Sequence, residues 1–173
     1  MGYTQPAKKS LGQHFLTDGY YLDRLLHLIG PQQHDQFIEI GPGSGCLTGL
    51  LVAKCQQLKA IEVDSDCVLF LRDLYSDMSD VDIIESDFLQ FDFDLLLLHR
   101  YRWVGNLPYN VSVPILLRLL RISDYMKDGI FLLQKEVAQR CYAQAGDKHY
   151  GRLGIVLQCV FEISACLSIP PEA

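Results

Sequence analysis

Long hydrophobic runs are missing from this chain. Its uninterrupted apolar runs, such as Leu95 to Leu98, are only a few residues long, whereas a membrane-spanning helix needs roughly 20 apolar residues. The amino-terminal segment carries Lys8 and Lys9 but lacks the apolar stretch of a signal peptide. We therefore expect neither a membrane span nor a signal peptide, and a cytoplasmic location.

Paired cysteines are missing as well, although cysteine itself is not. The chain has six cysteines, and none of them form the C-x-x-C pair typical of zinc and redox sites. They fall in apolar stretches rather than at turns, and a reducing compartment keeps such thiols free. We therefore predict buried free thiols, with no disulfide and no metal site. The six positions are Cys46, Cys55, Cys67, Cys141, Cys159 and Cys166.

The chain also lacks the excess of positive charge that usually marks a nucleic-acid-binding surface. It has 15 Lys and Arg against 21 Asp and Glu, for a net charge of -6. This balance counts against RNA as a partner, but the distribution of charge matters more than its sum. Acidic residues are concentrated in 62–94, and basic residues cluster elsewhere. Each of these two groups could be an ordinary solvated face. The basic residues are Lys8, Lys9, Arg118, Arg121, Lys135, Arg140, Lys148 and Arg152.

The chain does contain a regular alternation of helical and strand signals. Its 173 residues are 49% hydrophobic and 21% charged, which suits one globular domain with its own core. The alternation predicts an α/β fold with a mostly parallel sheet. We expect helices near 19–29, 46–55, 64–75, 114–122 and 134–143, and strands near 37–40, 58–63, 81–85, 101–104, 129–133 and 153–169.

A glycine loop, Gly41-Pro42-Gly43-Ser44-Gly45, follows the first predicted strand. Such glycines let the backbone approach a ligand at the first switch point of a doubly wound sheet. Acids mark successive strands: Glu39 lies within the first, Glu62 ends the second and Asp87 follows the third. At these places a carboxylate can accept hydrogen bonds from ribose hydroxyls (Glu62) and from an adenine amino group (Asp87).

This predicted pocket offers no positive charge to a phosphate. Neither Lys nor Arg occurs in the glycine loop, and there is no G-K-[ST] motif. Glu39 would be costly if buried unpaired, and a ligand's ammonium group, or water bound to it, would relieve that cost. The pattern indicates an adenosyl ligand. S-adenosylmethionine fits best because it has no phosphate and its sulfonium suits an acidic pocket.

The segment Asn106-Leu107-Pro108-Tyr109 follows the fourth predicted strand. The Asn106 side-chain oxygen and the Leu107 carbonyl can accept the two N–H groups of an exocyclic amine. Pro108 fixes the loop, and the Tyr109 ring can stack on a planar base. An ordinary proline turn is the alternative. Beside a methyl donor, the segment instead indicates methylation of an amine on a base that has left its stack.

Together these segments resemble the KsgA-type rRNA adenine N6-dimethyltransferases. The resemblance runs from about residue 8 to the last residue and implies a Rossmann-like class I fold that uses S-adenosylmethionine. The implied substrate is a pair of adjacent adenosines near the 3′ end of 16S rRNA in the 30S subunit, each methylated twice during ribosome biogenesis. The matching stretches are Leu11 to Leu16, Ile38 to Gly45, Ile61 to Asp64, Ser86 to Phe88, Gly105 to Ser112, Leu133 to Val137 and Tyr150 to Leu153.

The resemblance also implies roles for individual residues. The segment with His14 and Leu16 would fold over the cofactor, although the family usually has Asn where this chain has His14. We expect a monomer that needs no metal. The expected cofactor-binding residues are His14, Leu16, Glu39, Gly41, Gly43, Glu62, Asp87 and Asn106, and the expected catalytic residues are Asn106, Leu107, Pro108 and Tyr109.

Other readings of the same segments stay open. The macrolide-resistance adenine methyltransferases, which act on large-subunit rRNA, share the fold, but Leu133 to Val137 and Tyr150 to Leu153 look more like the KsgA type. A methyltransferase for another rRNA site or for a small molecule is a second alternative. A non-catalytic RNA-binding or ribosome-assembly factor is a third, and the intact Asn106 to Tyr109 segment argues against it.

The chain stops at Pro170-Pro171-Glu172-Ala173. In the family this position is followed by an aromatic- and proline-rich loop, a last antiparallel strand and a small helical domain that helps to grip rRNA. We therefore expect residues 1–173 to be an incomplete catalytic domain whose sheet has a gap or an exposed edge. Such a chain is expected to hold the cofactor but to methylate rRNA weakly or not at all.

Overall fold

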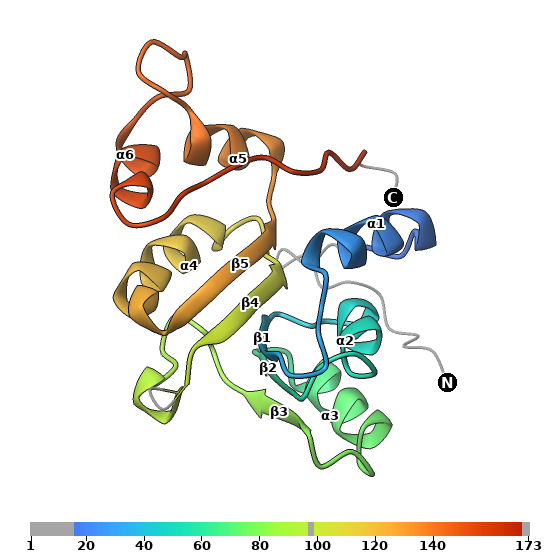
Figure 1. The fold of residues 1–173 in the computed structure, drawn as a ribbon. Coiled ribbons are helices and arrows are strands. Elements are labelled where there is room, and N and C mark those ends of the chain that lie inside the picture. The colour runs from blue at the N-terminus through green and yellow to red at the C-terminus, as the bar shows by residue number, and fades with distance from the viewer. Residues whose placement is uncertain (1–15, 97–98, 171–173) are drawn as a thin grey trace.

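The fold is built on one parallel sheet. The computed structural model describes residues 16–96 and 99–170. Five strands pair in the order β3-β2-β1-β4-β5, and every pair is parallel (Figure 1). The predicted α/β fold is confirmed, and the sheet is parallel throughout. The strands are β1 (Gln36–Ile40), β2 (Gln57–Glu62), β3 (Val81–Glu85), β4 (Tyr101–Asn106) and β5 (Met126–Leu132).

Helices cover both faces of this sheet, as Figure 1 shows. The first three helices contribute to one hydrophobic core, and the last three contribute to the other. The helices are α1 (Gly19–Ile29), α2 (Cys46–Leu51), α3 (Ser65–Leu74), α4 (Ser112–Leu119), α5 (Lys135–Tyr142) and α6 (Arg152–Gln158), with short 3₁₀ helices η2 (Phe93–Leu96) and η3 (Leu120–Tyr125).

Strand β1 separates the two cores. Successive side chains of a strand point to opposite faces. Ile38 and Ile40 belong to the core under α4, α5 and α6, whereas Phe37 belongs to the core under α1, α2 and α3. Glu39 therefore shares the face of Phe37. A carboxylate thus stands in an otherwise apolar layer, and it needs a polar partner there.

Local sequence signals set the ends of two helices. Asp18 caps α1, because its carboxylate accepts the Tyr20 N–H at 2.8 Å. Gly30 ends the same helix in the left-handed conformation, with φ 53°. Asp64 caps α3 through the Asp66 N–H at 3.1 Å. The helices predicted at 19–29 and after Asp64 are therefore confirmed.

The predicted strand at 153–169 is wrong. Residues 152–158 form α6, and residues 161–170 have no regular secondary structure. Leu153 and Leu157, one helical turn apart, are buried, whereas Ile155 and Val156 between them are exposed. Packing of this helical face overrides the β-propensity of Ile and Val. Among the described residues β5 pairs only with β4, so the sheet has an exposed edge there rather than a gap.

The predicted burial of all six cysteines is wrong in part. All six are free thiols. Cys67 and Cys141 are buried and Cys46 and Cys55 are partly buried, but the two cysteines nearest the end of the chain are exposed. Those two lie in segment 153–169, which was predicted to be a strand.

In the part of the chain that the structure describes, no helix is long and apolar enough to cross a membrane.

An ion-pair network ties the amino end of the sheet to α1. Arg102 on β4 donates to Asp35 Oδ2 at 2.8 Å. It also donates to Asp128 on β5, at 3.0 and 3.1 Å from the two carboxylate oxygens. Its remaining N–H groups reach the carbonyls of Ile29 at 2.6 Å and Gly30 at 3.4 Å, at the end of α1. One partly buried guanidinium therefore joins β4 to β5, to the residue that precedes β1 and to the end of α1.

We predict that Asp35→Asn lowers the free energy of unfolding by about 2 kcal/mol, because it removes a charge from a pair that is largely buried. Asp35 is 4% exposed. The matched control is Asp82→Asn, since Asp82 pairs with Lys59 at 3.2 Å but its side chain is 52% exposed. An exposed pair of this kind is expected to contribute less than about 1 kcal/mol.

The loss caused by Asp35→Asn should shrink in acid. Burial alone would raise the pKa of Asp35, but hydrogen bonds from Arg102 and the Gln32 amide lower it below its usual value. A carboxyl group with a lowered pKa stabilises the fold above its ordinary pKa and stops doing so as pH falls through the folded-state pKa. Urea unfolding at neutral and acid pH measures both effects. Equal losses for the two variants, or a loss independent of pH, would contradict this account.

Candidate functional site

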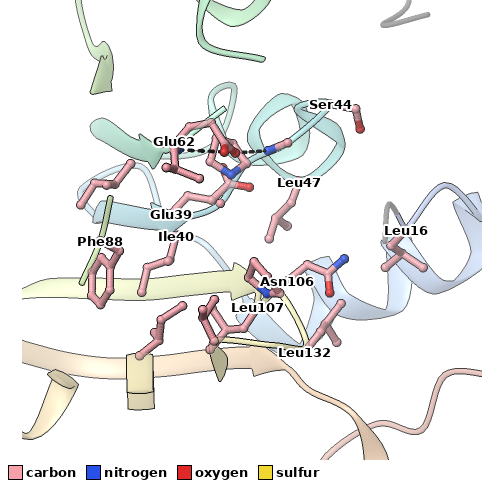
Figure 2. Close-up of a pocket in the computed structure, with 18 of the residues that line it drawn as sticks. Leu16, Glu39, Ile40, Ser44, Leu47, Glu62, Phe88, Asn106, Leu107 and Leu132 are labelled. Carbon is pink, nitrogen blue, oxygen red and sulfur yellow. Dashed lines mark hydrogen bonds between the residues drawn. The ribbon is translucent and has the colours of Figure 1, made fainter. Parts of the chain in front are cut away.

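A pocket opens at the carboxyl ends of the strands, shown in Figure 2. Its described lining comes from six separate segments. Five of them lie at or just past the strands, whose carboxyl ends converge at one edge of a parallel sheet. The predicted residues that line it are Leu16, Glu39, Gly41, Gly43, Glu62, Asp87, Asn106, Leu107, Pro108 and Tyr109. His14 lies outside the residues that the structure describes.

The glycine loop has a backbone that other residues adopt with difficulty. Gly41, Gly43 and Gly45 have φ values of 66°, 56° and 82°, all in the left-handed region. A Cβ atom on Gly45 would also lie 2.6 Å from Leu71 Cδ2. The alternate spacing of the glycines therefore follows from the shape of the turn that leads from β1 into α2.

Glu62 fixes this loop against the end of β2. Its Oε2 accepts the Gly43 N–H at 2.9 Å. Its Oε1 accepts the N–H groups of Val63 and Asp64, each at 2.9 Å. Dashed lines in Figure 2 mark hydrogen bonds of this carboxylate. Burial raises the pKa of Glu62, even though these amide hydrogen bonds oppose the shift.

Glu39 lies beside Glu62 and is 2% exposed. Its Oε2 accepts a hydrogen bond from the Thr48 hydroxyl on α2 at 2.8 Å. Burial raises the pKa of Glu39 to about 7; the charge of Glu62 adds to the shift and the Thr48 hydrogen bond opposes it. Glu39 is therefore a carboxyl group that changes its charge near neutral pH.

Asp87 lies just past β3, where the following turn fixes its carboxylate. Its Oδ1 accepts the Leu89 N–H at 2.9 Å, and its Oδ2 accepts the Gln90 side-chain amide at 3.1 Å. The same turn buries Phe88, whose ring lies 6.1 Å from that of Trp103 in an edge-on arrangement. The carboxylate is thereby kept at the pocket while the next side chain enters the core.

Asn106 ends β4, two residues beyond the predicted end of that strand. The Leu107 N–H donates to the Leu132 carbonyl on β5 at 3.1 Å, and the Leu107 side chain is 1% exposed. A Cβ atom on Gly105 would lie 2.6 Å from the Ile40 carbonyl, so only glycine allows β4 to approach β1 this closely. The segment is therefore anchored to the strands on both sides.

Several apolar residues at the pocket were not predicted from the sequence, among them Val63 and Leu89. Val63 is 50% exposed although it follows the buried Glu62, and it lines the pocket. Leu89 lines the same pocket after Asp87. Tyr109, which was predicted, is 39% exposed there. The signal for the first two was available, because each lies within two residues of a strand-end acid.

The charge of the pocket is of one sign. Its described lining contains Glu39, Glu62 and Asp87 but no Lys, Arg or His. In the described ranges, no three His, Cys, Asp or Glu side chains gather as a metal site would require. The pocket is therefore suited to a ligand that is neutral or cationic where it meets these acids.

Comparison with known families gives a direct match for this chain. The family model described as "Ribosomal RNA adenine dimethylase" matches residues 4–173. The chain belongs to this family.

The names of similar proteins agree with that assignment. The chain is 44% identical to the Ribosomal RNA small subunit methyltransferase A of Xylella fastidiosa, over 99% of this chain and 66% of the relative. Identity to the protein of that name from Coxiella burnetii is 40%, over 97% of this chain and 66% of the relative. The chain thus spans just under two thirds of the length of these relatives.

Two solved structures share the fold. A dimethyladenosine transferase from Plasmodium falciparum has a TM-score of 0.72 and 28% identity, over 84% of this chain and 52% of that one. The 23S rRNA methyltransferase ErmE has a TM-score of 0.70 and 21% identity, over 84% of this chain and 57% of that one. The second likeness shows the fold alone. The expected class I methyltransferase fold is confirmed.

The raised pKa of Glu39 predicts a pH-dependent stability. A carboxyl group whose pKa is raised to about 7 stabilises the fold fully below its ordinary pKa, and that contribution is lost as pH rises through the folded-state value. Glu39→Gln, which stays neutral, should therefore be more stable than the native chain by on the order of 2 kcal/mol near pH 8, and about equally stable near pH 5. Urea unfolding of the ligand-free protein at both pH values measures this, and a difference that does not grow with pH would contradict it.

Proposed function

We propose that this chain binds S-adenosylmethionine and is the catalytic part of an enzyme that methylates N6 of adenosine in rRNA. The single observation that carries the proposal is the meeting of three features in one pocket. The glycine loop, the strand-end acids and the segment from Asn106 to Tyr109 all line it. The chain also belongs to the rRNA adenine dimethylase family, which supports the same reaction.

The proposed cofactor fits the charge and shape of the pocket. Gly41 and Gly43 present backbone without a Cβ atom, and Leu16 supplies apolar cover. Asp87 would accept the adenine amino group. Glu62 already accepts three N–H groups, which leaves about one of its four lone-pair positions for a ribose hydroxyl. Val63 would then lie against the adenosine as an apolar wall.

The far end of the cofactor would meet other residues. Glu39, buried without a basic neighbour on the described lining, suits the cationic amino group, either directly or through water. His14 is proposed to hydrogen-bond the carboxylate, in place of the Asn usual in the family. Residues 1–173 would together form the cofactor-binding and catalytic unit.

The chemistry that we propose for the Asn106 to Tyr109 segment is positioning. When bound, the cofactor supplies an electrophilic methyl group on a sulfonium. The adenine amine is a poor nucleophile because its lone pair is delocalised into the ring. Asn106 Oδ1 and the Leu107 carbonyl would accept its two N–H groups, which favours a pyramidal nitrogen with its lone pair aimed at the methyl group.

Two further residues complete this segment. Pro108 would keep the Leu107 carbonyl in place. The exposed Tyr109 ring would stack on the flipped base, a contact worth roughly 1–3 kcal/mol. No general base is required at the start, since the amine proton becomes acidic only after methyl transfer.

The substrate that we propose is the pair of adjacent adenosines near the 3′ end of 16S rRNA, within the 30S subunit, each methylated twice. The names of the relatives, rRNA small subunit methyltransferase A at 40–44% identity, support small-subunit rRNA over large-subunit rRNA. The enzyme would act as a monomer in the cytoplasm. Mapping the modified nucleotides on unmethylated 30S subunits after incubation with the protein tests this assignment.

We predict that Asn106→Ala loses methyl transfer but keeps the cofactor. The variant should bind S-adenosylmethionine within about threefold of the native affinity in calorimetry, because it leaves the glycine loop and the acids intact. Transfer of labelled methyl groups to unmethylated 30S subunits should fall at least about 100-fold, since an acceptor that aligns the amine is lost.

The matched control is Asn110→Ala, because Asn110 is exposed and does not line the pocket. It should behave as the native chain does in both assays. Both variants should be made in this chain and in a fusion with the part of the 44%-identical relative outside the matched region. Transfer by Asn106→Ala at the native rate in the fusion would refute the proposed role.

A further inference from the structure

The polar contact of Glu39 comes from a residue outside the pocket. Glu39 occupies the face of β1 that carries Phe37, under the apolar residues of α1, α2 and α3. Thr48 is 0% exposed and does not line the pocket, whereas Leu47 before it does. The Thr48 hydroxyl donates to Glu39 Oε2 at 2.8 Å. The Thr48 hydroxyl therefore reaches the pocket through Glu39 and not by lining it.

The position of Thr48 is set by the glycine loop. The helix it belongs to begins at Cys46, directly after Gly45, and the Gly49 N–H donates to the Gly45 carbonyl at 2.8 Å. A helical threonine often turns its hydroxyl to a backbone carbonyl of the preceding turn. Here it turns to a strand carboxylate instead. The loop that shapes the pocket thus also fixes the donor to Glu39.

The hydrogen bond from Thr48 makes the two carboxylate oxygens of Glu39 different from each other. Oε2 receives the Thr48 hydroxyl, and within the described part of the chain no protein donor is found at Oε1. The residue itself lines the pocket. A carboxylate held at one oxygen keeps the other in a defined direction, and a buried carboxylate without a basic partner favours a cationic ligand group.

We propose that Thr48 is a positioning residue for cofactor binding. Its hydroxyl holds Glu39 so that the free carboxylate oxygen receives the cationic amino group of the cofactor's amino-acid moiety. The inference rests on the proposed binding of S-adenosylmethionine and adds a residue that makes no contact with the cofactor.

Within residues 16–96 and 99–170, the groups that face Glu39 from neighbouring elements supply no competing cation. Glu62 on β2 opposes the ionised form of Glu39. Tyr75, at the end of α3, has a pKa raised by burial and then by the charges of Glu39 and Cys46. Thr48 is the neighbour that favours the ionised Glu39. Removing its hydroxyl should therefore keep Glu39 protonated to a higher pH.

The test compares Thr48→Val with Thr48→Ser. Valine keeps the shape of threonine but has no hydroxyl, and serine keeps the hydroxyl. Calorimetry on this chain should use S-adenosylmethionine and, as a second ligand, methylthioadenosine, which has no amino-acid moiety. We expect Thr48→Val to weaken S-adenosylmethionine about tenfold near pH 7 and to leave methylthioadenosine within about twofold. Thr48→Ser should bind both ligands within about threefold of the native chain.

A pH series adds a readout that a purely structural role would not change. Native affinity for S-adenosylmethionine should rise as Glu39 ionises, and the midpoint of that rise should move to higher pH in Thr48→Val. Equal weakening of both ligands, or an unshifted midpoint, would overturn the role of Thr48. Failure of the native chain to bind S-adenosylmethionine would instead overturn the proposed function on which this role rests.

Discussion

The hydrogen bonds between the Glu62 carboxylate and backbone amides are the constraint on which the pocket depends. The Gly43 N–H lies 2.9 Å from Oε2, and the N–H groups of Val63 and Asp64 lie 2.9 Å from Oε1. These bonds join the glycine loop to the end of β2 and to the start of α3. Because the loop also begins α2, the same carboxylate indirectly sets where Thr48 meets Glu39. A charged acceptor makes such amide bonds stronger than neutral ones.

The acidic side chains at the two ends of the sheet have opposite electrostatic environments. At the amino end, Arg102 satisfies Asp35 and Asp128 together, and the pKa of Asp35 is lowered. At the carboxyl end, Glu39 and Glu62 are buried near one another, and the pKa of each is raised by burial. The first arrangement stabilises the fold. The second leaves negative charge to be compensated by a ligand, which is the pattern expected of a binding site.

Much of the site could be predicted from the sequence because strand ends of a parallel sheet converge. That rule placed Gly41, Glu62, Asp87 and Asn106 in one pocket without any knowledge of side-chain packing, and the structure confirms that they line it. The regular alternation of apolar segments likewise predicted the five strands of the sheet. Resemblance to a family added Leu16, which composition and spacing alone would not have singled out.

Other features depend on packing that a linear sequence does not show. The contact between Thr48 and Glu39 depends on which side of α2 faces β1. The bonds from Glu62 to the glycine loop depend on where β2 ends relative to that loop. Segment 153–169 was predicted as a strand because its Ile and Val residues favour strands, whereas burial of Leu153 and Leu157 selects a helix.

The central claim is that the acidic pocket takes a phosphate-free adenosyl methyl donor. Its most direct test is calorimetric titration of this chain with S-adenosylmethionine and, separately, with ATP, which carries the same adenosine on a triphosphate. We expect S-adenosylmethionine to bind and ATP to bind at least about 100-fold more weakly, because the described lining has three acids and no Lys or Arg. ATP binding as tight as that of S-adenosylmethionine would contradict the claim.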